Sequence, residues 1–458
     1  MARPIGAEAS EASRAWSRKA LGGYLSLPLF RNAAYLWLNT IILSGLGFVF
    51  WAAAARLYTA DAVGYGASAI AAINLIGSFS HLGLGFGIIR FLPERRESSA
   101  GLVNSVFLVT GATSLLASSV FLLGLDLWAP DLDLVRNHPV FLITFVAGGT
   151  AFSLSQVLDQ VFVATRRAGF VLIKNLGVGM LRVALIVSLA AFFASFGIVA
   201  AHAVAGGLLV GVSLVALLPA ALKGYKAALE WKPREIRSMS SFAAGNYLGA
   251  LLLLAPGNLF TIMVLNAAGP KDAAYFYVAW TIGMAASALA LALATSLFAE
   301  GSHDPRQLRQ HAMKAMLGGT VPSILVALTV ILGAGLILRA FGSDYASSSA
   351  TLLRLLALAS LPYFLVNVYL GVARVEKNIT AIVLVAGTMA AVSLAAGYPL
   401  VHSMGLQGIG IAWIAGQLSA LAIAVAFFAK GHLLVPDDRH QSSKSFNSIV
   451  EDTTGGGT

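Results

Sequence analysis

Four charged residues lie within or beside long apolar stretches of the sequence: Arg90, Asp159, Lys174 and Arg182. A charge in lipid costs free energy unless it reaches headgroups, water or an opposite charge. Arg90 stands in the run "GIIRFLPE". It therefore either anchors an apolar segment among headgroups or contacts a phosphate, which the forked guanidinium binds through two hydrogen bonds.

The next two charges are placed to meet each other. Asp159 and Lys174 are equally far from the Arg166-Arg167 turn, so two regular helices joined there would hold them at similar depth. The pair either stabilises this hairpin or includes a carboxylate that takes part in proton or cation coupling. Arg182 lies eight residues further on, about 12 Å deeper along a helix. It either faces a polar cavity or donates to helix carbonyls.

Four more residues are candidates for contact with a substrate. Asn39 and Asn246 are polar groups inside apolar stretches, while Arg56 and Lys271 lie near the ends of such stretches. Each also has a simpler explanation. The amides would make hydrogen bonds between helices, and the cations would extend toward the headgroups.

Prolines interrupt two of the apolar stretches and are candidate hinges. Pro256 and Gly257 follow each other in one stretch, and Pro362 lies in another. Proline removes a helix hydrogen bond and allows a bend. The bend either moves during function or is a static kink.

Patterns typical of enzymes are missing from the sequence. It contains no G-x-S-x-G or H-E-x-x-H motif, no cysteine and no spaced cluster of histidines and carboxylates. The many G-x-G pairs lie in apolar stretches, which favours close helix packing over phosphate binding. We therefore expect no catalysis, no metal and no cofactor. Coupling to protons, sodium or the membrane potential stays open.

The composition places the chain in a membrane. Hydrophobic residues make up 58% of it and charged residues 11%, and the mean hydropathy is +0.81. A water-soluble protein of 458 residues needs a more charged surface. The net charge of +10 reflects the positive-inside bias of membrane proteins rather than nucleic-acid binding. Residues 1–20 are polar, so we expect no removable signal peptide.

Apolar runs of about 20 residues predict an all-α membrane protein with twelve transmembrane helices. Their expected ranges are 34–55, 64–89, 102–125, 139–163, 169–193, 197–221, 242–266, 273–299, 317–341, 349–373, 378–401 and 405–429. If both termini are cytoplasmic, 24 of the 30 Lys and Arg residues lie in cytoplasmic segments and two lie within the membrane spans. The four outside are Arg56, Arg136, Lys271 and Arg339. This asymmetry supports the count of twelve.

The spans divide into two sets of six. We expect a cytoplasmic tail at 1–32, an N-lobe at 33–221, a linker at 222–241, a C-lobe at 242–430 and a disordered tail at 431–458. The first tail forms either an interfacial helix or an irregular lead-in. The run "GIVAAH" at the start of span six is similar to "GIGIAW" at the start of span twelve. Two six-helix halves with a substrate site between them are a recurring plan of transporters.

Three regions resemble the polysaccharide exporters and O-antigen flippases of the multidrug/oligosaccharidyl-lipid/polysaccharide superfamily. Residues 39–94 carry "AAARLY" followed by "GLGFGIIRFLPE", residues 158–169 read "LDQVFVATRRAG", and residues 246–304 include "AAYFYVAWTI" and "SLFAEGS". The resemblance implies a V-shaped pair of six-helix bundles around a central cavity. Relatives line this cavity with cations, but the first span here has no arginine at mid-membrane, which leaves Arg182 as the substitute.

The resemblance also implies a function and partners. Such proteins transfer an oligosaccharide linked to polyprenyl diphosphate from the cytoplasmic to the outer leaflet of the inner or plasma membrane, for cell-surface polysaccharide biosynthesis. The expected partners are this lipid-linked substrate, membrane lipids and other polysaccharide assembly proteins. Two alternatives stay open: a cation-coupled exporter of small molecules, and a membrane polysaccharide polymerase or ligase.

Overall fold

The computed structural model describes residues 28–94, 99–287 and 308–429, which form helices and contain no strand. The long helices are α2 (Pro28–Leu57), α3 (Ala60–Ser80), α5 (Ser99–Leu123), α8 (Pro139–Ala164), α9 (Ala168–Leu189), α10 (Ser195–Val212), α12 (Pro233–Ala268), α13 (Pro270–Ala286), α15 (Leu308–Arg339), α16 (Ser343–Val375), α17 (Ile379–Met404) and α18 (Leu406–Ala429). The short ones are α4 (Leu84–Phe91), η1 (Leu92–Glu94), α6 (Leu125–Trp128), η2 (Pro130–Leu132), α7 (Asp133–Asn137), η3 (Ser213–Leu217) and α11 (Leu218–Ala221).

Eleven helical segments within the described ranges are long and apolar enough to cross a membrane. Each corresponds to one predicted span. The remaining prediction, 273–299, coincides with α13 as far as Ala286, and its later residues lie outside the described part. The fold class predicted from the sequence is therefore confirmed, with about twelve transmembrane helices.

Two helices begin before the predicted lobe boundaries, and one predicted span is interrupted. The linker expected at 222–241 already contains the start of α12 at Pro233, and α2 begins at Pro28 within the expected tail. Proline is favoured at the first position of a helix, where its missing N–H leaves no bond unmade. The span expected at 64–89 is broken into α3 and α4. The expected interfacial helix before residue 28 and the tail after 429 lie outside the described residues.

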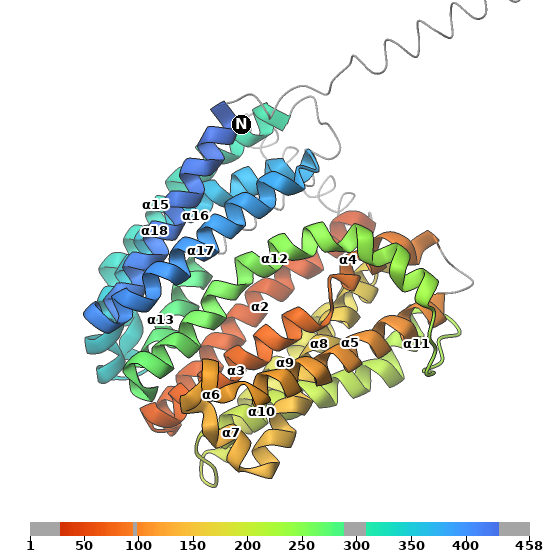
Figure 1. The fold of residues 1–458 in the computed structure, drawn as a ribbon, viewed down its shortest axis with the longest axis horizontal. Coiled ribbons are helices and arrows are strands. Elements are labelled where there is room, and N and C mark those ends of the chain that lie inside the picture. Colours follow the sequence, from red (N-terminus) through yellow and green to blue (C-terminus); the bar gives the residue numbers. More distant parts are fainter. Residues whose placement is uncertain (1–27, 95–98, 288–307, 430–458) are drawn as a thin grey trace, which may run out of the picture.

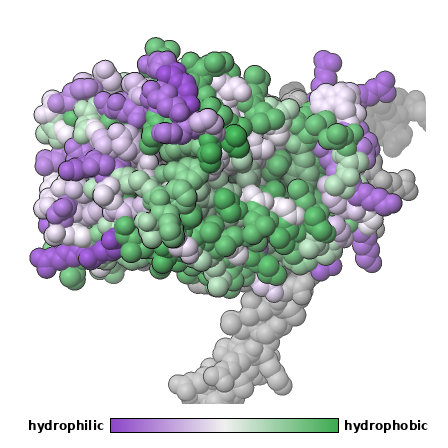
Figure 2. All heavy atoms as spheres, turned by 90° about the horizontal axis from the view of Figure 1, so that it is seen from below, coloured by the Kyte–Doolittle hydropathy of each residue, from purple (hydrophilic) through white to green (hydrophobic). Residues whose placement is uncertain are grey.

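The surface agrees with a membrane environment. Figure 2 shows a broad hydrophobic band between two hydrophilic ends. Large apolar side chains are strongly exposed, among them Leu332 (83%) and Val215 (81%). Water would disfavour such a surface, whereas lipid accommodates it. We call the end that holds Arg90 and Arg166 the inner end and the end that holds Arg56 and Lys271 the outer end.

The helices gather in two groups with α12 between them (Figure 1). We call α2–α11 the N-lobe and α12–α18 the C-lobe. Within the C-lobe, α17 packs on α12 and α16 on α13. Across the boundary, α3 packs against both α12 and α13, and α4 packs against α12. Helix α12 therefore belongs to the C-lobe by sequence and also forms much of its contact with the N-lobe.

The outer ends of the lobes are joined by backbone and side-chain contacts. Arg56 of α2 donates to the carbonyls of Ala340 (3.0 Å) and Arg339 (2.6 Å) at the end of α15. A Cβ at Gly64 of α3 would overlap the carbonyl oxygen of Pro270. Two further contacts lie here: the Asn266 amide donates to the Trp128 carbonyl at 2.9 Å, and the rings of Phe48 and Phe341 are 5.0 Å apart. We call these contacts the outer seam.

Candidate functional site

The break between α3 and α4 shapes the candidate site. Leu82 (φ 49°) and Gly83 (φ 70°) both have positive φ, which an α-helix does not tolerate. His81 ends α3, and its Nδ1 accepts a hydrogen bond from the Gly83 N–H at 3.1 Å. The apolar pattern of "FSHLGLGFG" continues through this point, so hydropathy alone could not reveal the break.

A helix that stops inside a membrane leaves its last carbonyls without partners in the helix. Here Tyr247 of α12 supplies one. Its hydroxyl lies 2.7 Å from the Phe79 carbonyl and 3.2 Å from the Ser78 carbonyl, and its ring packs edge-on against His81, with centroids 5.4 Å apart. The Phe79 carbonyl also accepts from the Leu82 N–H at 3.2 Å, so Tyr247 adds a hydrogen bond from the other lobe to the end of α3.

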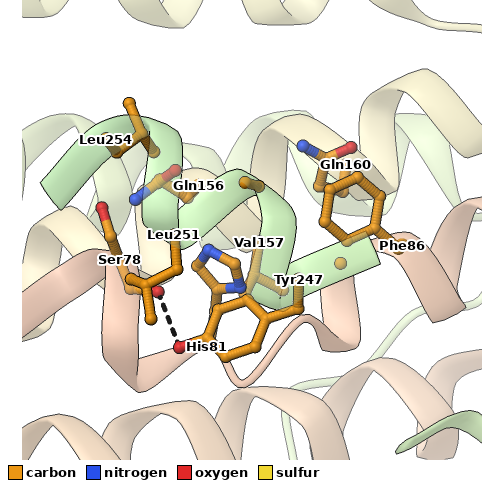
Figure 3. A pocket seen from close by; sticks show the side chains of 11 residues that line it. Ser78, His81, Phe86, Gln156, Val157, Gln160, Tyr247, Leu251 and Leu254 are labelled. Atoms are coloured by element: carbon orange, nitrogen blue, oxygen red, sulfur yellow. Dashed lines mark hydrogen bonds between the residues drawn. The ribbon is translucent and has the colours of Figure 1, made fainter. Parts of the chain in front are cut away.

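A cavity of about 130 Å³ lies at this break, between the two lobes. It is lined by α3, α4 and α8 from the N-lobe and by α12 from the C-lobe, and we call it the inter-lobe pocket (Figure 3). Its polar lining residues are Ser78, His81, Gln156, Gln160 and Tyr247. Glycines let α4 approach its neighbours: a Cβ at Gly85 in the pocket wall would be 2.8 Å from Gln160 Cγ, and one at Gly87, beside the pocket, would be 2.7 Å from Met239 Cε. The G-x-G run thus serves close packing here, as predicted.

The ion pair expected from the sequence is present. Lys174 is fully buried, and its Nζ lies 3.1 Å from Oδ1 of Asp159, whose side chain is 26% exposed. The ammonium also donates to the hydroxyl and carbonyl of Ser155. Asn175 then donates to Asp159 Oδ2 (3.4 Å) and to Asn39 Oδ1 (3.1 Å), so α2, α8 and α9 share one polar network. The geometry suits a structural pair, and contact with a substrate stays a prediction.

Arg182 contacts a histidine and an aromatic ring. Its Nη1 lies 3.2 Å from Nδ1 of His202 on α10, and its guanidinium carbon is 4.3 Å from the centre of the Phe50 ring. Because arginine only donates, His202 must accept through Nδ1. The Arg182 Nε is buried without a hydrogen-bond partner among the described residues. Arg182 does not line the inter-lobe pocket, and its role in substrate binding stays a prediction.

The other predicted site residues are spread over the fold. Arg56 belongs to the outer seam, where it caps α15 rather than extending to headgroups. Lys271 is exposed at the start of α13, and Arg90 is exposed in the last turn of α4, 5.6 Å from the centre of the Phe91 ring. The side chain of Asn246 lies outside those that the structure describes. The structure thus brings Asp159, Lys174 and Asn39 together and leaves Arg56, Arg90, Arg182 and Lys271 outside that network.

The candidate hinges lie within continuous helices. Pro256 and Gly257 are inside α12, and Pro362 is inside α16. A Cβ at Gly257 would be 2.7 Å from the indole nitrogen of Trp280, so this glycine provides space for α13. Whether these positions bend during function stays a prediction.

Sequence reasoning missed the residues that matter most for the pocket. Gln156, Gln160 and Tyr247 were not singled out, and neither were His202 and Gly64. The glutamines are four residues apart on α8, a spacing that puts them on one helix face. This was the available signal, but nothing in the sequence connects that face to α12.

The comparisons with known proteins agree with this fold. A family model described as "Polysaccharide biosynthesis protein" matches residues 29–298, which is more than half of the chain. The chain belongs to this family. The resemblance seen in the sequence is therefore confirmed at the family level. No curated protein matches.

Solved structures of transporters share the fold at low sequence identity. Lipid II flippase MurJ in an inward closed conformation has a TM-score of 0.69 and 11% identity, covering 88% of this chain and 87% of that one. An inward-facing MATE multidrug resistance transporter of the MOP superfamily has a TM-score of 0.62 and 16% identity, covering 85% and 93%. A point mutant of the Vibrio cholerae MATE transporter VcmN has a TM-score of 0.61 and 17% identity, covering 88% and 96%. These likenesses show the fold alone.

Proposed function

We propose that this protein transfers an oligosaccharide linked to polyprenyl diphosphate from the cytoplasmic to the outer leaflet of the cell membrane. The observation that carries the proposal is the match to the polysaccharide biosynthesis family over residues 29–298. The fold shared with lipid II flippase MurJ supports it.

Moving a glycan across lipid requires a polar path, and two lobes can enclose one between them. Each buried hydroxyl without a hydrogen bond costs roughly 2–7 kcal/mol, so the sugars need a polar path shielded from lipid. A path between the lobes would supply it, while the polyprenyl tail stays in the bilayer. The seam at the outer end would hold that path closed on the outside until the lobes rearrange.

Arg90 is suited to meet the diphosphate at the inner entrance. It is exposed in the last turn of α4, at the end that the charge pattern predicts to be cytoplasmic. Arginine binds phosphate oxygens through two parallel, charge-assisted hydrogen bonds, whereas lysine acts as a point charge. Anchoring of α4 among headgroups is the competing role, and it predicts no effect on substrate transfer.

A leaflet-accessibility assay in proteoliposomes tests the proposed function. A polyprenyl-diphosphate oligosaccharide is placed in one leaflet, and an external glycosidase reports its arrival in the other. We expect transfer by the wild type and a loss of at least about tenfold in Arg90→Ala, since a hydrogen bond to a charged group contributes about 1.5–3 kcal/mol. Arg90→Lys is the matched control and should retain part of the activity.

The same vesicles decide between the proposed function and its rival. If the wild type transfers none of several polyprenyl-linked glycans but drives cation-dependent efflux of a dye, the protein is a small-molecule exporter and the proposal fails. If Arg90→Ala transfers as well as the wild type, Arg90 is an anchor only.

A further inference from the structure

The inter-lobe pocket has a lining that selects for one kind of ligand. Its polar groups are two carboxamides, two hydroxyls and an imidazole, from Gln156, Gln160, Ser78, Tyr247 and His81. Among its eleven described lining residues there is no Asp, Glu, Lys or Arg. His81 accepts through Nδ1, which leaves its remaining ring proton on Nε2 and the ring uncharged.

This chemistry excludes several ligand classes. A divalent cation would require carboxylates, and a diphosphate would require arginine or lysine. A purely apolar molecule would offer no hydrogen bond to the carboxamides of Gln156 and Gln160, whereas the Tyr247 hydroxyl already donates to a backbone carbonyl. A neutral molecule with many hydroxyl or amide groups would satisfy the polar groups of the lining. Each of these side chains can still donate or accept a hydrogen bond in addition to the bonds it makes within the protein.

Two further observations favour a sugar ring. The Nε2 amide of Gln156, a residue of the pocket wall, is buried and has no hydrogen-bond partner in the described structure, so this wall holds a donor that the fold leaves unsatisfied. The rings of His81, Tyr247 and Phe86 surround the same space (Figure 3). The volume of about 130 Å³ is room for several water molecules or one small polar ring, not for an oligosaccharide.

We propose that the inter-lobe pocket at the α3–α4 break binds a single neutral sugar residue of the lipid-linked oligosaccharide. This inference rests on the proposed function for the identity of the whole substrate. The break creates the site by ending α3 beside His81, and Tyr247 closes it from the other lobe. A sugar bound here contacts both lobes at once and so stabilises the arrangement in which they meet.

The position of Arg90 indicates which sugar residue this is. Phe86 lines the pocket, and Arg90 follows four residues later on the same face of α4, about 6 Å along the axis. A diphosphate held by Arg90 places the sugar to which it is joined next to Phe86. The pocket therefore takes the first sugar after the diphosphate.

Binding of free methyl glycosides tests the pocket without requiring transport. Methyl β-glucoside and methyl N-acetyl-β-glucosaminide are added to the full-length protein in lipid nanodiscs, and saturation-transfer NMR gives their apparent affinity. We expect binding to the wild type, weakened roughly two- to tenfold in Gln156→Leu, as loss of one hydrogen bond predicts. Gln417→Leu is the matched control, because Gln417 is a buried glutamine of α18 outside the pocket, and it should bind as the wild type does.

A second measurement does not depend on the folding of the glutamine variant. The chain has no cysteine, so Ala250→Cys places a single thiol in the pocket wall. We expect either glycoside to slow its reaction with a maleimide. Equal affinities in wild type and Gln156→Leu, or labelling that neither sugar slows, would overturn the proposal.

The two proposals fail in different ways. A wild type that transfers lipid-linked oligosaccharide but binds neither glycoside refutes the sugar pocket and leaves the proposed function standing. A wild type that binds the glycosides in a Gln156-dependent manner but transfers no lipid-linked glycan supports the pocket's ligand class and refutes the proposed function.

Discussion

Gly64→Ala is expected to reduce transfer of lipid-linked oligosaccharide at least about tenfold while the protein still folds. The added Cβ would overlap the backbone carbonyl of Pro270, which cannot turn aside as a flexible side chain can. The outer ends of α3 and α13 must then move apart. The outer seam would no longer close, and the cycle would stop with this side open.

Labelling at the seam measures the predicted opening. Ala268→Cys places one thiol at the half-buried outer end of α12 in the otherwise cysteine-free chain. We expect Gly64→Ala to increase its reaction rate with a membrane-impermeant maleimide.

A second glycine provides the matched control. Gly111 lies inside α5, and a Cβ there would have no atom within 4 Å. Gly111→Ala makes the same chemical change, with the same gain of about 1 kcal/mol in helix propensity, but without the overlap. It should transfer and label as the wild type does. If Gly64→Ala behaves in the same way, closure of the seam at Gly64 is not required.

Neutralising one partner of the buried ion pair is expected to destabilise the protein by about 3 kcal/mol. Asp159→Asn leaves the fully buried Lys174 without its counter-charge, and removing one partner of a buried pair typically costs about 3–5 kcal/mol. Partial exposure of Asp159 puts the expected value at the lower end of that range. Lys174→Met should be destabilising for the converse reason.

The double variant Asp159→Asn/Lys174→Met separates the two roles of the pair. Without either charge, the desolvation cost disappears together with the attraction, so stability should return close to that of the wild type. Thermal unfolding in detergent measures this. Asp126→Asn is the control, because it breaks an exposed ion pair with Arg136 at 2.8 Å and should leave the unfolding temperature unchanged.

Transport by the double variant then distinguishes a structural role of the pair from a role in coupling or substrate contact. Activity close to wild type makes the pair structural. A double variant that is stable but inactive would show that Asp159 or Lys174 takes part in coupling or substrate contact, which is the alternative that the sequence left open.

The sequence predicted those features that depend on local composition and depth. Apolar runs gave the spans, and the alternation of cationic loops gave their orientation, because both follow from the cost of charge in lipid. Asp159 and Lys174 were paired correctly because a tight hairpin fixes the relative depth of residues on its two helices. No information about distant helices was needed for any of these predictions.

The features that were missed depend on contacts between distant segments. Arg56 caps the end of α15, where its partner Ala340 is 284 residues away in the chain. Arg182 meets His202 on the next helix, α10, a contact that depends on which faces of the two helices are turned toward each other. The break at Leu82 occurs in apolar sequence, and Tyr247 adds a hydrogen bond to it from the other lobe. Hydropathy indicates whether a helix can lie in lipid, but it does not indicate which helix packs against its buried face.

A glycan can leave the space between the lobes only if the outer seam opens, and the distance across that seam is the most direct test. Leu57→Cys and Leu336→Cys place spin labels on exposed outer-end positions of α2 and α15. Double electron–electron resonance in nanodiscs should show a short distance in the resting protein. Addition of polyprenyl-diphosphate oligosaccharide should produce a second, longer one. A single short distance in both conditions, in protein that transfers the same substrate in vesicles, would contradict passage between the lobes.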